Sequence, residues 1–241
     1  MNDVNMNMSF QLNTLDEDSA RLRQATMSYR VFEALKQAIV QLQLRPGNLL
    51  SEAEVAKQLG VSRQPVREAF IKLAEVGLVE IRPQRGTFVV LISRKEVENA
   101  RFIREAVEVA LARRASAEAA PEAIARMRRS LERQRDAHER GDIAGFLRED
   151  ERFHQAIALS VDCDRAWRLL ENLKAQMDRV RYLSMPLATP VDTLIEQHER
   201  ILTAIENGRA DEAAAAMRDH LAEILKSLPK IAAAQPDLFV D

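Results

Sequence analysis

Three histidines and one aspartate are the side chains in this sequence whose types and spacing could hold a metal ion. Asp150 and His154 stand four residues apart in EDERFHQAI, a spacing that places both on one face of a helix. Alone, such a pair is more typical of a solvated ion pair on a helix than of a metal site. His198 and His220 follow in LIEQHERILTAI and AAAAMRDHLAEIL, each flanked by apolar residues at helical spacing. We therefore expect three imidazoles to point inward from three helices.

Three inward imidazoles and a carboxylate match the donors that Zn, Ni or another borderline divalent ion binds. A buried imidazole without a partner is costly, and a shared ion would remove that cost. The alternative is three separate buried histidines, each bonded to the backbone or to a carboxylate. The predicted metal ligands are Asp150, His154, His198 and His220, a set that leaves coordination positions open for water or a ligand.

The region that carries these residues, 95–230, shows helical periodicity throughout. Helices are expected at about 95–119, 121–140, 142–161, 163–185, 190–207 and 210–228, with breaks at prolines, glycines and Asp162. Six amphipathic helices predict an antiparallel bundle. Residues 231–241 are expected to form a tail, and the acidic, polar residues 1–20 a disordered one.

Charge divides the chain into segments of opposite sign. The whole chain has a net charge of −2, yet residues 21–94 hold twelve Lys and Arg against six Asp and Glu. This basic segment within a mildly acidic chain indicates a polyanionic partner for that segment alone. No apolar run is long enough to span a membrane, and a single cysteine is typical of a reducing cytoplasm. No secretory leader is expected at the N-terminus.

The basic segment predicts a winged helix-turn-helix, so the fold as a whole is expected to be mainly α. SYRVFEALKQAIVQLQL carries one apolar stripe, SEAEVAKQLG runs from a capping serine to a terminal glycine, and SRQPVREAFIKLAEVG has Ser62 as its N-cap. LVEIRPQRGTFVVLI alternates apolar and polar residues around PQRG, which indicates a two-stranded hairpin with a basic tip.

This arrangement predicts binding to double-stranded DNA. The third helix of such a motif presents its N-terminal residues to base edges in the major groove, where the arginine fork matches guanine. Arg63 and Arg67 share the exposed face of that helix, and Ser62 with the helix N-terminus suits phosphate. Arg82 and Arg85 at the hairpin tip would reach the adjacent backbone or minor groove. The alternative is a small packing domain whose arginines are solvated.

The stretch LSEAEVAKQLGVSRQPVREAFIKLAEVGLVEIRPQRGTFV resembles the DNA-reading domain of GntR-family transcription regulators. The resemblance implies DNA contacts at the helix start and along the hairpin: Ser62, Arg63, Gln64, Arg67, Arg82, Arg85, Gly86 and Thr87. The family often has a basic residue directly after the Glu of LSE, where this chain has Ala53. That departure puts one contact in doubt and leaves more of the binding to Arg63 and Arg67.

Residues 95–230 resemble the FCD ligand-binding domain of the FadR branch, and the RspR-like regulators within it. Metal-binding members carry D-x-x-x-H, then H, then H on successive helices, and the four predicted ligands match in that order. FIREAVEVALARRASA resembles the opening helix, whose cavity-facing arginine falls on Arg104. Asp162-Cys163 stands where the family often has Gly-Asn. The resemblance implies a homodimer that reads an inverted repeat.

The chain is therefore expected to be a regulator and not an enzyme: a cytoplasmic repressor whose operator affinity depends on a small carboxylate, such as a sugar acid. Arg104 beside a Zn or Ni ion would suit a carboxylate, because the guanidinium binds two oxygens and the ion a third. Two alternatives stay open. The ion could be purely structural, with no small effector, or the open site could activate water in a metallohydrolase, although spacing places no general base beside it.

Overall fold

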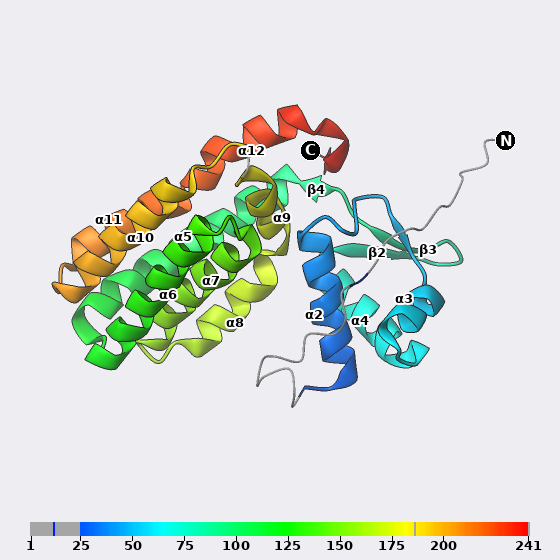
Figure 1. Ribbon diagram of the computed structural model, residues 1–241, viewed down its shortest axis with the longest axis horizontal. Helices are drawn as coiled ribbons and strands as arrows, with labels where there is room; N and C mark the ends of the chain where they lie inside the picture. Colours follow the sequence, from blue (N-terminus) through cyan, green and yellow to red (C-terminus); the bar gives the residue numbers. More distant parts are fainter. Residues whose placement is uncertain (1–11, 13–24, 186, 241) are drawn as a thin grey trace. The chain divides into compact units, whose positions relative to one another are not determined.

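The computed structural model describes residue 12, residues 25–185 and residues 187–240 (Figure 1). The described chain divides into two compact units, one up to Ile92 and one from Ser93 to Phe239. Most of the expected disordered tail, residues 1–20, lies outside the described residues. None of the described helices is long and apolar enough to cross a membrane.

The described part of the first unit contains three helices and a small antiparallel sheet. Its elements are α2 (Met27–Val40), β1 (Leu49–Leu50), α3 (Glu52–Leu59), α4 (Arg63–Glu75), β2 (Val79–Arg82) and β3 (Gly86–Val89). The Ser51 hydroxyl accepts from the Glu54 amide at the start of α3, and Gly60 ends that helix with a φ of 65°. The apolar stripes of α2 and α4 are buried, with Leu35, Val66 and Leu73 fully so.

The wing contains one strand more than the hairpin that we expected. β1 pairs with β3 on the side opposite β2, in the order β1-β3-β2, with Leu50 opposite Thr87. At the tip of the hairpin, Gly86 has a φ of 106°, and a Cβ there would lie 2.5 Å from Leu49 Cδ1. The positive φ therefore favours glycine at this position, and a side chain there would also displace the end of the Leu49 side chain.

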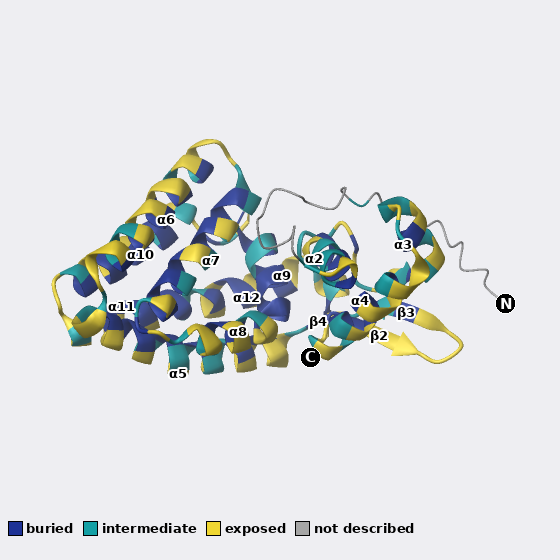
Figure 2. Cartoon of the chain, turned by 90° about the horizontal axis from the view of Figure 1, so that it is seen from below, coloured by how far each residue is buried: buried dark blue, intermediate teal, exposed yellow. Residues whose placement is uncertain are grey.

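The second unit is a bundle of antiparallel helices. Its elements are α5 (Arg94–Glu118), α6 (Pro121–Glu139), α7 (Ile143–Leu159), α8 (Asp164–Leu173), α9 (Ala175–Ser184), α10 (Val191–Glu206), α11 (Ala210–Leu221) and α12 (Glu223–Ala234). The buried residues lie along the inner faces of these helices (Figure 2). Phe146, Phe153, Ile201 and Met217 lie at the centre of this core. The predicted bundle is confirmed, but two of its six expected helices are broken in two, at Lys174 and at Ala222.

The end of the chain is structured where we expected a tail. Residues 231–234 continue α12, and η1 (Pro236–Leu238) and β5 (Phe239–Val240) follow. β5 pairs with β4 (Ile92–Ser93) in a two-stranded sheet. The cause is apolar burial, because Ile231, Ala232 and Phe239 are all buried. These apolar residues are visible in the sequence, but so short a run does not by itself predict a helix or a strand.

Candidate metal centre and nucleic-acid interface

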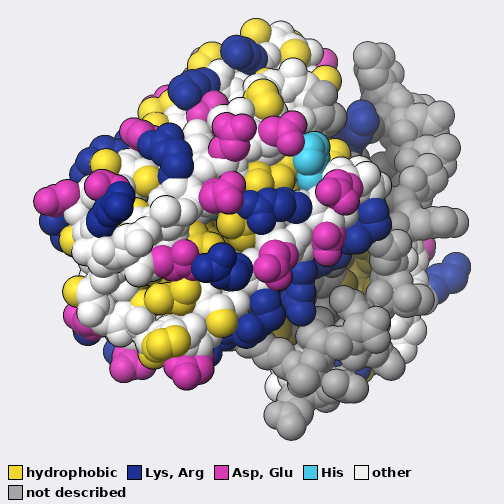
Figure 3. Space-filling view, turned by 60° about the vertical axis from the view of Figure 1, so that its left-hand side comes forward, with side chains coloured by type: hydrophobic (Ala, Val, Ile, Leu, Met, Phe, Trp, Pro, Cys, Tyr) yellow, Lys and Arg dark blue, Asp and Glu magenta, His cyan; other side chains and the backbone are white. Residues whose placement is uncertain are grey.

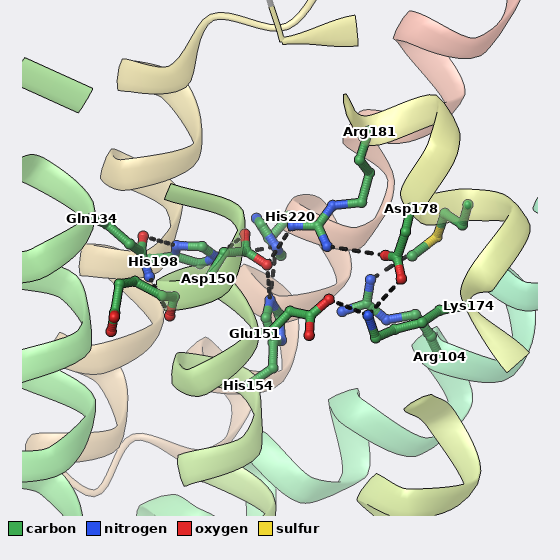
Figure 4. Close-up of polar contacts among 12 residues, drawn as sticks. Arg104, Gln134, Asp150, Glu151, His154, Lys174, Asp178, Arg181, His198 and His220 are labelled. Carbon is green, nitrogen blue, oxygen red and sulfur yellow. Dashed lines mark hydrogen bonds and ion pairs between the residues drawn. The ribbon is translucent and has the colours of Figure 1, made fainter. Parts of the chain in front are cut away.

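The four predicted ligands come together inside the helical bundle (Figure 4). One turn of α7 presents Asp150 and His154, α10 presents His198, and α11 presents His220. One ligand atom from each of the four lies within 4.8 Å of every other, and all four residues are buried. The local i, i+4 spacing places the first pair, and the apolar faces of α10 and α11 turn the other two histidines inward.

Each imidazole has an acceptor at its outer nitrogen. His198 Nδ1 lies 2.7 Å from Gln134 Oε1, and His220 Nδ1 lies 3.0 Å from Gln197 Oε1. His154 Nδ1 lies 2.5 Å from Glu108 Oε2. Both glutamine amides donate from Nε2 to another acceptor, which fixes the direction of their oxygens. Because amide oxygens only accept, the proton of the neutral His198 and His220 rings lies on Nδ1 and the lone pair on Nε2.

The inner Nε2 atoms of the three imidazoles converge on one another. His220 Nε2 lies 3.2 Å from both His154 Nε2 and His198 Nε2. Asp150 Oδ1 lies 3.6 Å from His198 Nε2, and this buried oxygen accepts no hydrogen bond from any described residue. Lone pairs held together in this way repel one another unless a cation lies among them. The residues therefore fit a divalent ion with imidazole and carboxylate ligands.

The protonation states also suit a metal. Burial lowers the pKa of His198 to about 3, against the opposing charge of Asp150, and burial lowers the pKa of His220 well below 6.5. Burial alone would raise the pKa of Asp150, but the charge of Arg181 together with the three histidines outweighs it and keeps that pKa far below the ordinary value. At neutral pH the site thus presents His198 and His220 as neutral imidazoles beside an ionised carboxylate, the forms that bind metals.

Arg104 is less free than the sequence suggested. Its Nε donates to Glu108 Oε1 at 2.5 Å, its side chain is 4% exposed, and Glu108 in turn contacts His154. Burial opposes ionisation of Glu108, but the charges of Arg104 and His154 outweigh it and lower its pKa to about 2. Arg104 therefore holds the carboxylate that orients a ligand histidine, besides lining the cavity next to the site.

A second arginine lies closer to the ligands. Arg181 on α9 donates to Asp150 Oδ2, and its other terminal nitrogen lies 3.5 Å from Asp178 Oδ1. Lys174, at the break between α8 and α9, bonds Asp178 at 2.6 Å and also Glu151, the neighbour of Asp150 in the chain. These ion pairs join α7 to α9 beside the site, in a ring that the backbone between Asp150 and Glu151 closes (Figure 4).

A cavity of about 40 Å³ opens next to the ligands, between α5, α9, α10, α11 and α12. Its lining includes His220 from the ligand set together with Arg104 and Arg181, and both apolar and polar side chains from α9 to α12 and from the segment between α9 and α10 complete it. The outer surface is different in character: on the face of the helical unit in Figure 3, basic and acidic side chains are interspersed.

In the first unit, the start of α4 exposes the side chains expected to contact DNA. Ser62 is the N-cap residue, but its hydroxyl makes no capping hydrogen bond with a described residue. Arg63 and Gln64 are exposed, and Gln64 donates to Glu68 at 3.1 Å. Arg67 is also exposed and forms a two-pronged ion pair with Glu52 of α3, with both N–O distances 2.9 Å. A DNA partner would compete with Glu52 for this guanidinium.

The hairpin presents three of its four expected contact residues. Arg82, Arg85 and Gly86 are exposed, and Arg82 pairs with Glu80 while its guanidinium lies 5.0 Å from the Phe88 ring centre. Thr87 differs, because its side chain is 6% exposed and packs inward with Val89. A DNA contact at this position would therefore come from the backbone of Thr87, and it stays a prediction. Strand alternation with Val89 places the Thr87 side chain on the inner face.

Comparison with known proteins agrees with the geometry of both units. Residues 27–89 match the model of the "Bacterial regulatory proteins, gntR family", and residues 100–223 match that of the FCD domain. The chain is 43% identical to the "HTH-type transcriptional repressor RspR" of Escherichia coli (strain K12), over 88% of this chain and 93% of that protein. The chain belongs to the GntR family.

Two further similarities agree with this GntR-family assignment. The "Probable D-xylose utilization operon transcriptional repressor" of Paenarthrobacter nicotinovorans is 33% identical over 88% of this chain and 92% of its own. The solved structure of Escherichia coli McbR/YncC shares the fold, with a TM-score of 0.74 at 21% identity, covering 88% of this chain and 99% of that one. The GntR-family chain is thus a transcription regulator of the FadR type and not an enzyme.

Sequence reasoning missed the residues around the ligands of this GntR-family regulator. Glu108, Gln134 and Gln197 hold the three imidazoles, and Arg181 holds Asp150. The sequence does hold a signal for Gln134, because this residue follows Met127 and Leu131 on the same buried face of α6. A polar residue on such a stripe needs a buried partner. No comparable pattern identified Arg181.

Proposed function

We propose that this GntR-family regulator holds one divalent ion, Zn or Ni, on Asp150, His154, His198 and His220. The observation that carries the proposal is the convergence of three imidazole Nε2 atoms whose Nδ1 atoms are already engaged, beside a carboxylate oxygen that lacks a partner. When bound, the ion would supply positive charge for a carboxylate oxygen. The FCD match supports a metal-binding role for this domain.

The proposed ligand of the regulator is a small carboxylate in the adjacent cavity. Arg181 and His220 line that cavity together, so an anion there would lie beside both a guanidinium and the ion site. Arg104 supports this end of the cavity through Glu108. Because Arg181 already shares its charge with Asp150 and Asp178, a ligand carboxylate would change the ion-pair ring that joins α7 to α9.

We further propose that the regulator is a cytoplasmic repressor that binds an inverted repeat as a homodimer. The repressor names of two relatives support the direction of regulation. In the proposed complex α4 enters the major groove with Arg63, Gln64 and Arg67, and Arg82 and Arg85 of the hairpin contact the backbone. The effector changes operator affinity only if it binds two alternative packings of the helical bundle with different affinity. A difference of about 5.5 kcal/mol in its binding free energy shifts the bundle almost completely from one packing to the other.

The test is operator affinity, measured on the metal-loaded protein with and without a panel of small carboxylates. At least one acid should change the affinity of the wild type, and this response should be lost in Arg181→Ala and His198→Ala and reduced in Arg104→Ala. DNA binding that no acid or sugar acid alters would overturn the sensor function.

A purely structural ion is the second candidate, and one observation favours it. Four protein ligands are available, and four such ligands would suffice for the tetrahedral shell that is usual in structural zinc sites. Removal of the ion separates the two roles. A structural ion should take much of the thermal stability of the bundle with it, whereas an effector-binding ion should take the ligand response first.

A further inference from the structure

The cavity beside the ion site contains one polar group that nothing in the described protein satisfies. Thr189 is 6% exposed, its Oγ1 is buried, and no described residue forms a hydrogen bond with that oxygen. Thr189 lines the cavity together with His220 and Arg181. A buried hydroxyl without a partner costs roughly 1–3 kcal/mol, so its retention here needs an explanation.

The other polar groups around the cavity are already engaged. The hydroxyl of Ser184 donates to Arg181 O, and that of Ser227 donates to Ile224 O. Glu223 accepts from both Gln197 and Lys226. Thr189 is therefore the lining residue with an uncommitted hydroxyl among those that the structure describes.

The backbone around Thr189 is held rigidly to the helix that carries Arg181. The amides of Leu187, Ala188 and Thr189 all donate to Ser184 O, at 3.0, 2.7 and 3.0 Å. Ser184 is the last residue of α9. Because rotation about χ1 exchanges the hydroxyl and the methyl group of a threonine, the Oγ1 atom can turn to a ligand without movement of the backbone.

The polar groups of the lining limit what can occupy the cavity. Apolar side chains, Leu194, Leu221 and Ile224 among them, form part of the wall. A six-carbon sugar acid needs several further hydrogen-bond partners, whereas a short acid with a single hydroxyl needs one partner.

We propose that Thr189 is a specificity residue of the effector site, and that the site takes a carboxylate of two to four carbons that bears a hydroxyl group. The carboxylate lies at the end lined by Arg181 and His220, and the hydroxyl pairs with Thr189 Oγ1. This inference rests on the proposed function and deepens it, because it names the chemical class of the effector and sets it apart from the sugar acids.

The experiment measures binding of matched acids to the metal-loaded full chain by calorimetry. Lactate is compared with propionate, 3-hydroxybutyrate with butyrate, and gluconate represents the sugar acids. Thr189→Val removes the hydroxyl at nearly constant shape. Ser227→Ala is the control, because its hydroxyl is committed to a backbone carbonyl. The unfolding midpoint of each ligand-free variant reports whether it folds.

In the wild type, one hydroxylated acid should bind about tenfold more tightly than its matched partner, the value of one good hydrogen bond. Thr189→Val should abolish this preference, leave the affinity for the unsubstituted acid unchanged and fold at least as stably as the wild type. Ser227→Ala should keep the preference.

Three outcomes would overturn the inference while leaving the proposed function intact: gluconate binds most tightly, no hydroxylated acid is preferred, or the preference survives in Thr189→Val. Failure of every acid to bind, in a protein that still binds operator, would instead refute the proposed function and the inference with it.

Discussion

Replacement of Gln134 by methionine tests how the protein prepares its ligands. Gln134 and His198 are both fully buried, and the bond between Gln134 Oε1 and His198 Nδ1 is 2.7 Å long. Methionine fills a similar volume but accepts poorly, so the Nδ1 proton loses its partner. The ring can then carry its proton on Nε2 instead, the atom that faces the other imidazoles.

Two magnitudes follow for Gln134→Met. Loss of the partner of a buried donor costs about 1–3 kcal/mol in the free energy of unfolding of the metal-free protein. Loss of a residue that orients a ligand histidine typically lowers metal affinity by about 10–100-fold. The two effects are measured separately, by denaturant unfolding in the presence of a chelator and by competition titration of Zn and Ni against a chromophoric chelator.

The matched control is Gln155→Met, because Gln155 is only partly buried on α7, next in the chain to His154. It should leave both quantities within experimental error. If Gln134→Met binds metal as tightly as the wild type, orientation of His198 by this amide is not part of the site, and the argument from fixed tautomers is wrong.

Three further predictions concern DNA binding, a buried ion pair and the pH dependence of stability. Arg67→Ala should lower operator affinity and relax sequence preference, whereas Arg85→Ala should weaken binding evenly and flatten the salt dependence; equal, sequence-independent losses would contradict these roles. Lys174→Met leaves buried Asp178 with Arg181 as a cationic partner at 3.5 Å and should cost about 1–3 kcal/mol in unfolding free energy, against less than about 1 kcal/mol for exposed Lys226→Met. The folded pKa of His198, about 3, is below its unfolded value of 6.5, so the unfolded chain binds the extra proton. The metal-free protein should therefore lose up to about 1.4 kcal/mol per pH unit from this residue as the pH falls below 6.5, and His198→Gln should show a shallower slope.

The sequence predicted the parts of the site that depend on local spacing. Asp150 and His154 share a helix face because they are four residues apart, and apolar neighbours turned His198 and His220 inward. The residues that engage the ligands lie far away in the chain: Gln134 is 64 residues from His198, and Arg181 is 31 from Asp150. Such pairings arise from tertiary packing, and no periodicity in one segment encodes them.

Tertiary packing, which the local sequence does not encode, also explains where the fold differs from the predicted one. Neither Lys174 nor Ala222 is a glycine or proline, so nothing local predicted a helix break at either position. At Lys174, ion pairs with Asp178 and Glu151 hold the side chain in the interior where α8 ends. The burial of the Thr87 side chain, by contrast, follows from strand alternation with Val89, which the sequence does hold.

The most direct test of the central claim is the metal content of the purified regulator, by native mass measurement and elemental analysis of the same sample. The account predicts one divalent ion per chain in the wild type and none in a folded His198→Gln variant, with Zn or Ni restoring the ion to stripped wild type alone. A metal-free wild type that neither binds these ions nor gains stability from them would contradict it.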